Sequence, residues 1–172
     1  MGGSGDYFDV ADLVIKMEHF RPINVTTEAK RISKQIKGNR HHEGGASFGE
    51  ISHRVPKPIS LNSRNGKKVQ ASARGLTKIQ YGVEIIDLQY VEQLVEESQT
   101  RMIADVLYYL ERNGIMKHKK TINELLELVE KQLEEKGISF ASTFYGHPGE
   151  VARPRRFEIA AALNRLRSLK IQ

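Results

Sequence analysis

A glycine-rich stretch near the amino terminus is the first part of the sequence whose residue types suit chemistry. Gly3, Ser4, Gly5 and Asp6 follow one another there. Backbone without side chains can approach a phosphate closely, and this favours Asp6, which follows three glycines in four positions, as a residue beside a phosphate. Two other interpretations stay open, a tight turn that needs small residues and a flexible linker.

A second group with a shared chemistry consists of Lys and Arg side chains in segments expected to be loops, a hairpin and a helix start. Cations on loops suit phosphate backbones, and the Ser, Asn and Gly residues between them add hydrogen-bond donors. The predicted nucleic-acid-binding residues are Arg40, Arg54, Lys57, Arg64, Lys67, Lys68, Arg74, Arg153, Arg155 and Arg156. Few aromatic residues accompany them, which argues against a platform on which bases stack. The alternative is a solubilising surface that also balances acidic helices.

The candidate metal ligands are His41, His42, Glu43 and His53. Their spacing matches no standard zinc pattern, and adjacent histidines point to different sides of an extended chain. We therefore expect solvated histidines and no metal site. The chain has no Cys, which excludes disulfides and thiolate metal sites, and the sequence supports no Ser-His-Asp nucleophile system.

The net charge of +6 is unevenly distributed along the 172 residues. Residues 30–80 hold twelve Lys and Arg against two acids, residues 83–135 hold six against twelve, and residues 136–172 hold seven against two. This pattern favours either packing of basic against acidic segments or a basic face for a polyanion. No apolar run approaches the roughly 18 residues that span a bilayer, and no signal peptide is visible. We therefore expect a cytoplasmic protein without a membrane partner.

Hydrophobic periodicity predicts short strands followed by longer helices. A strand is expected over residues 13–17, a helix capped by Thr26 or Thr27 up to about residue 37, and a loop over residues 39–65. The pair Asn65-Gly66 predicts a hairpin next to strands at 67–73 and 78–86. Three further helices are expected over residues 87–113, from a capping box at Thr121 to Gly137, and over 155–169. The predicted class is α+β.

Several segments of the chain resemble the ABC-class ATPase family, a group of bacterial proteins with few characterised members. Residues 2–12 read Gly-Gly-Ser-Gly-Asp-Tyr-Phe-Asp-Val-Ala-Asp and look like its switch segment. Residues 86–88, 91–95, 98–101 and 153–167 look like its C-terminal portion. The resemblance implies a C-terminal fragment of a longer ATPase. In it, residues 1–38 would end the ATPase core, 39–86 would form a basic loop and β-hairpin region, and 87–172 a helical C-terminal region.

The same resemblance implies that the parent protein uses ATP and Mg²⁺. In an ABC-type core the switch segment lies beside the γ-phosphate, so that Ser4 and the nearby backbone would position the attacking water. The sequence contains no Gly-x-x-x-x-Gly-Lys-Ser/Thr phosphate loop. Without that backbone cradle and its Lys, the chain alone is expected neither to bind a cofactor nor to hydrolyse ATP.

We therefore predict that the chain completes an ATPase core and carries a basic surface for partner binding or dimerisation. The expected partners are the rest of the ATPase core, RNA or DNA, and a second copy of the chain. Two functions of other classes stay open, a free-standing nucleic-acid-binding module and a structural dimerisation arm. The apolar strand at residues 13–17 is expected to recruit a partner, because an unpaired strand edge exposes backbone hydrogen-bonding groups.

Overall fold

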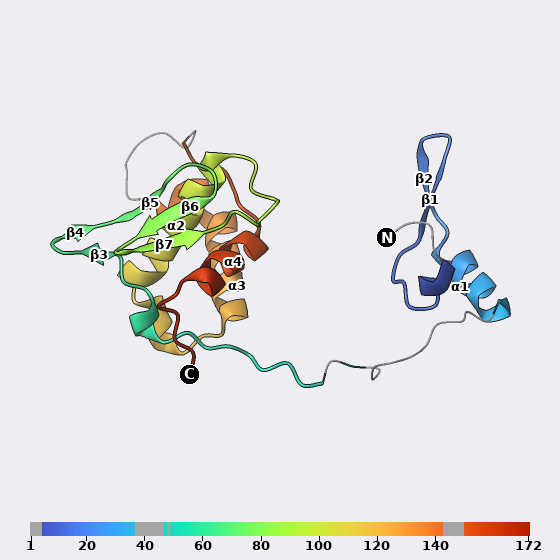
Figure 1. Cartoon of the computed structure of the whole chain (residues 1–172), viewed down its shortest axis with the longest axis horizontal. Helices are drawn as coiled ribbons and strands as arrows, with labels where there is room; N and C mark the ends of the chain where they lie inside the picture. The colour runs from blue at the N-terminus through green and yellow to red at the C-terminus, as the bar shows by residue number, and fades with distance from the viewer. Residues whose placement is uncertain (1–4, 37–46, 48, 143–149) are drawn as a thin grey trace. The chain divides into compact units, whose positions relative to one another are not determined.

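The computed structural model of the 172-residue chain describes residues 5–36, 47, 49–142 and 150–172. The chain divides into two compact units, Met1–Ile51 (unit 1) and Ser52–Gln172 (unit 2) (Figure 1). Their helices and small antiparallel sheets confirm the predicted α+β class. The three-part division with boundaries after residues 38 and 86 stays a prediction.

Unit 1 contains a turn of 3-10 helix, a β-hairpin and an α-helix. Their bounds are η1 (Gly5–Tyr7), β1 (Ile15–Glu18), β2 (Arg21–Asn24) and α1 (Thr26–Gln35). The two strands pair antiparallel, and His19 and Phe20, which both have positive φ, form the loop between them. The strand expected over residues 13–17 is therefore present, slightly shifted. It has a partner on one side because the chain turns back directly after it.

The start of α1 is capped differently from the prediction. Oδ1 of Asn24 accepts a hydrogen bond of 3.0 Å from the backbone N–H of Thr26, so that Asn24 satisfies a free N–H group of the first turn. The hydroxyl of Thr26 accepts instead from the backbone N–H of Val14, at 2.9 Å. This bond ties the start of the helix to the residue before β1. The helix ends at Gln35, before the expected end at about residue 37, and Ile36 is already extended.

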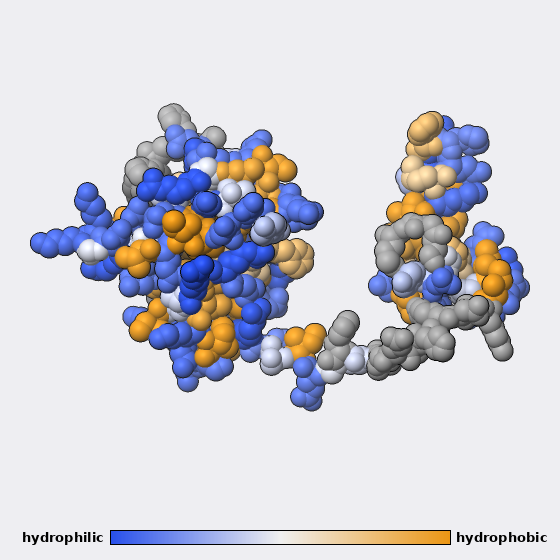
Figure 2. Space-filling view, viewed as in Figure 1, coloured by the Kyte–Doolittle hydropathy of each residue, from blue (hydrophilic) through white to orange (hydrophobic). Residues whose placement is uncertain are grey.

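Unit 1 has almost no core. Ala29 is the one buried residue among those that the structure describes in this unit. Leu13, just before β1, and Ile15 and Met17 in the strand alternate along the chain and are 59%, 53% and 64% exposed. Figure 2 shows hydrophobic residues along this hairpin. A lone two-stranded hairpin is marginally stable in water, and an exposed apolar face of this kind marks an interaction site. We call these three residues the apolar face of unit 1.

Unit 2 contains a three-stranded antiparallel sheet with helices on one face. The strands in sheet order are β5 (Ala71–Ala73), β6 (Lys78–Tyr81) and β7 (Glu84–Asp87), and the helices are α2 (Glu97–Arg112), α3 (Ile122–Lys136) and α4 (Arg156–Arg165). Helix α2 packs along β5 and β6, and α4 packs along β7 (Figure 1). Helix α3 contacts α4. The unit also contains the 3-10 turns η2 (Pro58–Ser60), η3 (Ile115–His118) and η4 (Ile138–Ala141).

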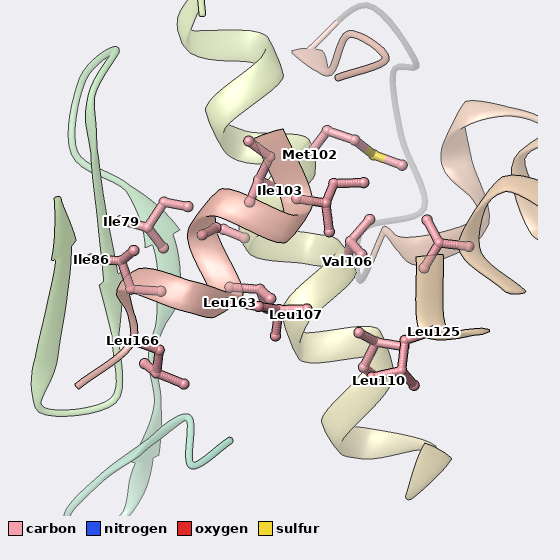
Figure 3. Packing of buried hydrophobic residues seen from close by; sticks show 14 of the residues in the cluster. Ile79, Ile86, Met102, Ile103, Val106, Leu107, Leu110, Leu125, Leu163 and Leu166 are labelled. Carbon is pink, nitrogen blue, oxygen red and sulfur yellow. The ribbon is translucent and has the colours of Figure 1, made fainter. Parts of the chain in front are cut away.

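The core of unit 2 lies between the sheet and the helices. Figure 3 shows that its side chains come from both the sheet and the helices. They include Ile79 and Ile86 of the sheet, Ile103 and Leu107 of α2, and Leu163 of α4. These five side chains are completely buried. Burial of an aliphatic side chain of this size contributes about 1.5–3 kcal/mol, so the cluster gives unit 2 the core that unit 1 lacks.

Residues 78–86 form two strands, and the prediction of one strand was wrong. Tyr81 lies opposite Glu84, so Gly82 and Val83 form a two-residue loop in which Gly82 has φ of 54°. A Cβ atom on Gly82 would lie 2.2 Å from the backbone oxygen of Asn62, so only glycine fits this close approach. The alternation of apolar residues continues through the loop, and periodicity alone therefore hides the turn.

The helix expected over residues 87–113 begins later, at Glu97. Before it, the backbone N–H of Val91 donates to the oxygen of Leu88, and that of Leu94 donates to the oxygen of Val91. These three apolar residues are buried at a spacing of three, which imitates helical periodicity. The helix begins after Glu96, whose backbone N–H donates to the side chain of Gln99 in a capping arrangement.

Two local predictions are confirmed in unit 2. The hydroxyl of Thr121 accepts from the N–H of Glu124, whose carboxylate accepts in return from the N–H of Thr121, which is the predicted capping box. Strands β3 (Arg64–Asn65) and β4 (Lys68–Val69) form the predicted hairpin around Gly66, which has φ of 61°. Helix α4 ends at Arg165 and is shorter than expected, and the strand expected over residues 67–73 is divided between β4 and β5.

The last residues of the chain hold the first segment of unit 2. Pro56 and Ile171 form an isolated antiparallel bridge, and the N–H of Lys57 donates to the oxygen of Lys170 at 2.7 Å. The buried hydroxyl of Ser60 donates to the oxygen of Lys170 and accepts from its N–H. The backbone of residues 55–60 is therefore fixed, although it has little regular secondary structure.

Candidate nucleic-acid interface

The β3–β4 hairpin carries three of the predicted phosphate-binding cations. Arg64, Lys67 and Lys68 are exposed, and within the described part of the chain their side chains make no hydrogen bond or ion pair. The hairpin projects from the body of unit 2, and Figure 2 shows mainly hydrophilic residues on it. The N–H of Gly82 supports its base by donating to the oxygen of Gln70 at 2.7 Å. Exposed cations without acidic partners on a supported hairpin suit phosphate contacts.

Two further predicted cations lie in the fixed segment before the hairpin or directly before that segment. The backbone oxygen of Arg54 accepts from the N–H of Ile122 at 3.0 Å, and the backbone of Lys57 is held by the C-terminal tail. Both side chains are exposed and have no acidic partner among the residues whose positions are known. The fold thus orders the backbone beneath these cations and leaves their charges available. Arg40 lies outside the described residues.

Arg74 has a similar setting in the turn between β5 and β6. Its N–H donates to the oxygen of Lys78 at 2.7 Å, which closes the turn, and its side chain is exposed. Lys78 was not predicted as a site residue. It lies beside Ile79, which is buried, so the alternation of β6 places Lys78 on the face of the sheet that the helices leave open. That alternation is a signal from which sequence reasoning could have found Lys78.

The three predicted arginines near α4 have acceptors within unit 2. Arg153 forms an ion pair with Glu130 of α3, and Nε of Arg155 donates to Glu158 at 2.7 Å. Nη2 of Arg156 donates to Oδ1 of Asn123 at 2.7 Å. Of the two expectations from the charge pattern, packing of the basic tail against the acidic segment therefore describes Arg153, whereas the partner of Arg155 belongs to the basic tail itself. Binding of nucleic acid by these three residues stays a prediction.

The start of α3 brings further basic side chains close to the fixed segment. Hydrogen bonds from the backbone and hydroxyl of Thr121 lower the pKa of Glu124, and the positive charges of Lys120 and His53 lower it further. Lys120 and His53 therefore lie near the carboxylate of Glu124. The backbone oxygen of Arg54 contacts the first residue of α3, because it accepts the hydrogen bond from Ile122. Lys120 was missed by the sequence prediction because it lies in a short turn within an otherwise acidic block.

The metal prediction and the switch segment lie partly outside the described residues. His41, His42 and Glu43 are not described, and in the rest of the chain no three His, Cys, Asp or Glu side chains cluster as metal ligands. Gly3 and Ser4 are also outside, while Gly5 and Asp6 lie in η1. The N–H groups of Phe8, Val10 and Ala11 donate to backbone oxygens within the turn, so they are not free to cradle a triphosphate.

Comparison with known families first gives the class of protein. Residues 1–54 match the P-loop domain of the ABC ATPase family, which confirms the resemblance to ABC-class ATPases. Residues 70–172 match the MRB1590 C-terminal domain. Because this match covers more than half of the chain, the chain belongs to the MRB1590 C-terminal domain family. No curated protein matches the chain. In the described part of the chain, no helix is long and apolar enough to cross a membrane.

Proposed function

We propose that this chain is the C-terminal part of an ABC-class ATPase and that unit 1 completes the ATPase core of that protein. The observation that carries the proposal is the apolar face of unit 1. Each of its three side chains is more than half exposed, in a segment that matches a P-loop domain. A segment of a folded core is expected to show buried apolar residues only where the rest of that core covers it.

Covering the apolar face would contribute a large free energy compared with the hydrophobic stabilisation that unit 1 has alone. Complete burial of an aliphatic or Met side chain contributes about 1.5–3 kcal/mol, so covering Leu13, Ile15 and Met17 adds several kcal/mol. The outer edge of β1 also offers backbone N–H and C=O groups to a neighbouring strand. Both contributions suit addition of this hairpin to a larger sheet.

In the complete protein, Gly3, Ser4, Gly5 and Asp6 would lie near the nucleotide. ATP with Mg²⁺ is the cofactor that membership of a P-loop family implies for that protein. The phosphate loop and the catalytic acid would come from the rest of the core. The contribution of this chain is to position the switch segment and to close the sheet behind it.

Titration calorimetry between this chain and the phosphate-loop portion of an ABC-class ATPase with the same C-terminal domain tests the proposal. We expect binding that weakens at least about tenfold in the double variant Leu13→Ser, Ile15→Ser, because two apolar contacts are lost. The matched control is Ile85→Ser, which removes an exposed apolar side chain of unit 2. Absence of binding, or equal weakening by the control, would contradict the proposal.

A second function, nucleic-acid binding, is favoured by the cations of unit 2 that have no acidic partner among the described residues. They are Arg54, Lys57, Arg64, Lys67, Lys68 and Arg74. Such residues contact phosphates and carry little sequence information, so RNA and DNA are both candidate ligands. Arg153, Arg155 and Arg156 contribute less to this surface in our proposal, because each already has an acceptor.

A second copy of the chain is the alternative occupant of the apolar face. When the remaining core is absent, association of two chains through this face would produce a homo-oligomer, as a structural dimerisation arm would.

The cytoplasm is the compartment that suits an ATPase with nucleic acid as a partner.

A further inference from the structure

An open pocket lies beside the start of α4. It is lined by Glu130, Arg153, Pro154, Arg155 and Arg156 and has a volume of roughly 330 Å³. Three of its five lining residues are arginines from one short stretch of chain. Guanidinium groups present planar sets of N–H donors that match the oxygens of phosphates and carboxylates. The pocket is therefore suited to a small anion.

The charges around the pocket are only partly compensated. Arg155 is paired with Glu158, whose side chain is 1% exposed and which also accepts from the backbone N–H of Arg155. Arg153 is paired with Glu130, which itself lines the pocket. Each of these two arginines thus has one carboxylate partner inside unit 2.

Arg156 differs from the other two arginines because its acceptor is neutral. Its Nη2 donates to the amide oxygen of Asn123, and the amide nitrogen of Asn123 donates in turn to Glu127 at 2.6 Å. This relay orients the guanidinium, and within the described part of the chain no carboxylate forms an ion pair with it. A preorganised cation without a counter-charge is the strongest attraction that the pocket offers an anion.

The geometry points to a binding site for a phosphate dianion in this pocket, either free phosphate or the terminal phosphate of a small phosphate monoester. Arg156 supplies the uncompensated charge. Arg153 supplies a second guanidinium, which releases the carboxylate of Glu130 and binds the ligand in its place. Each guanidinium has five N–H donors, and the bonds described above use only one on Arg156, so a dianion with three oxygens finds several donors in reach.

Glu130 sets the affinity of this site. Its carboxylate competes with the ligand for Arg153 and repels a second negative charge in the same pocket. The site is therefore expected to be weak in the native chain and to tighten when this carboxylate is neutralised. The inference does not rest on the proposed function, since it concerns neither the ATPase core nor the cations of the hairpin.

The test is a titration of the ¹⁵N-labelled full chain with inorganic phosphate, followed by the backbone amide signals of Arg153, Arg155, Arg156 and Phe157. Sodium chloride at matched ionic strength is the control for screening. We expect saturable shifts with phosphate, at least about fivefold weaker affinity for Arg156→Ala and tighter binding for Glu130→Gln. Arg167→Ala, which removes an exposed arginine after α4, is the matched control and should bind as the native chain does. The dispersion of each spectrum shows whether the variant is folded.

Two further ligands identify the source of the phosphate. Adenosine monophosphate carries a terminal dianion, and dimethyl phosphate carries a single charge like a nucleic-acid backbone. We expect the monophosphate to bind about as well as free phosphate and dimethyl phosphate to bind at least about tenfold more weakly. Shifts equal to those with chloride, no effect of Arg156→Ala, an equal effect of Arg167→Ala, or equal affinity for the diester would each overturn the inference.

Discussion

The hydroxyl of Tyr81 in β6 donates a hydrogen bond of 2.5 Å to Oε2 of Glu111 in α2. The same carboxylate accepts from the backbone N–H of Ser63, at 2.9 and 3.1 Å to its two oxygens. Glu111 thus joins the sheet, the helix and the segment before the hairpin. Burial raises the pKa of Tyr81 far above its ordinary value, and the hydrogen bond to Glu111 raises it further. The hydroxyl of Tyr81 therefore keeps its proton, and donates to Glu111, at pH values where an ordinary tyrosine begins to ionise.

Tyr81→Phe is expected to destabilise unit 2 by about 1–3 kcal/mol, because it removes a hydrogen bond to a charged group while the carboxylate stays partly buried. Urea unfolding measures this difference. The matched control is Tyr90→Phe, since Tyr90 is largely exposed and should change stability little. Equal stability of the Tyr81 variant and the native chain would show that this junction does not stabilise the fold.

Gly82→Ala is expected to destabilise unit 2 by about 2–4 kcal/mol, through the left-handed backbone and the clash with the backbone oxygen of Asn62. Gly75→Ala separates these two causes. Gly75 also has positive φ, but an added Cβ atom there meets nothing within 4 Å. It should lose only about 1 kcal/mol, the cost of the conformation alone. Thermal unfolding that places both variants at the same stability would argue against the close approach at Gly82.

Asp105 gives unit 2 a dependence on pH. Burial raises the pKa of this half-buried carboxyl from its ordinary 3.8 to about 6, although the charge of Arg112 opposes the shift. Between these values the unfolded chain is ionised while the folded chain holds the proton, so stability falls as the pH rises from about 4 through 6. Asp105→Asn should therefore be more stable than the native chain at pH 8 by about 1 kcal/mol, after allowance for solvent screening, and equally stable at pH 4.

Denaturant unfolding at the two pH values tests this difference, with Glu92→Gln as a control in which an exposed acid is neutralised. The control should follow the native chain at both pH values. An Asp105 variant that also follows the native chain at pH 8 would mean that the folded protein tolerates this charge without cost.

The parts of the fold that could be predicted from sequence are those whose signal is local. The capping box of Thr121 and Glu124 fixes the start of α3, and Asn65-Gly66 marks the hairpin within two residues. The wrong predictions concern features that depend on contacts between residues distant in the sequence. The turn at Gly82 depends on its approach to Asn62, and the burial of Leu88 and Val91 in successive turns depends on the core that covers them.

The candidate site was predictable to a similar extent. Composition identified the cations, because charge is a property of the sequence. Which of them have acidic partners depends on how α3 and α4 pack, as the pairing of Arg153 with Glu130 shows. The exposure of Leu13 and Ile15 could not be derived from periodicity either, since their alternation is the same whether a partner covers them or water does.

The basic surface of unit 2 should bind single- or double-stranded nucleic acid with little sequence preference. Fluorescence anisotropy with labelled RNA and labelled DNA should show affinity that falls by about one unit of log K per log salt for each phosphate neutralised. The triple variant Arg64→Ala, Lys67→Ala, Lys68→Ala should weaken binding for every sequence and flatten the salt slope by about 2–3. Replacement of Arg165, Arg167 and Lys170 by Ala removes the same number of exposed cations elsewhere in unit 2 and should have a smaller effect. Absence of binding to both RNA and DNA at low salt would contradict the prediction that this surface binds nucleic acid.

Reconstituted ATP hydrolysis tests the central claim, that unit 1 completes an ATPase core, most directly. The measurement is phosphate release from Mg-ATP by this chain, by the phosphate-loop portion of an ABC-class ATPase with the same C-terminal domain, and by their mixture. The account predicts no activity of this chain alone, at least about tenfold faster release by the mixture than by the other portion alone, and loss of that gain with Leu13→Ser, Ile15→Ser but not with Ile85→Ser. Hydrolysis by this chain alone, or a mixture no faster than its parts, would contradict it.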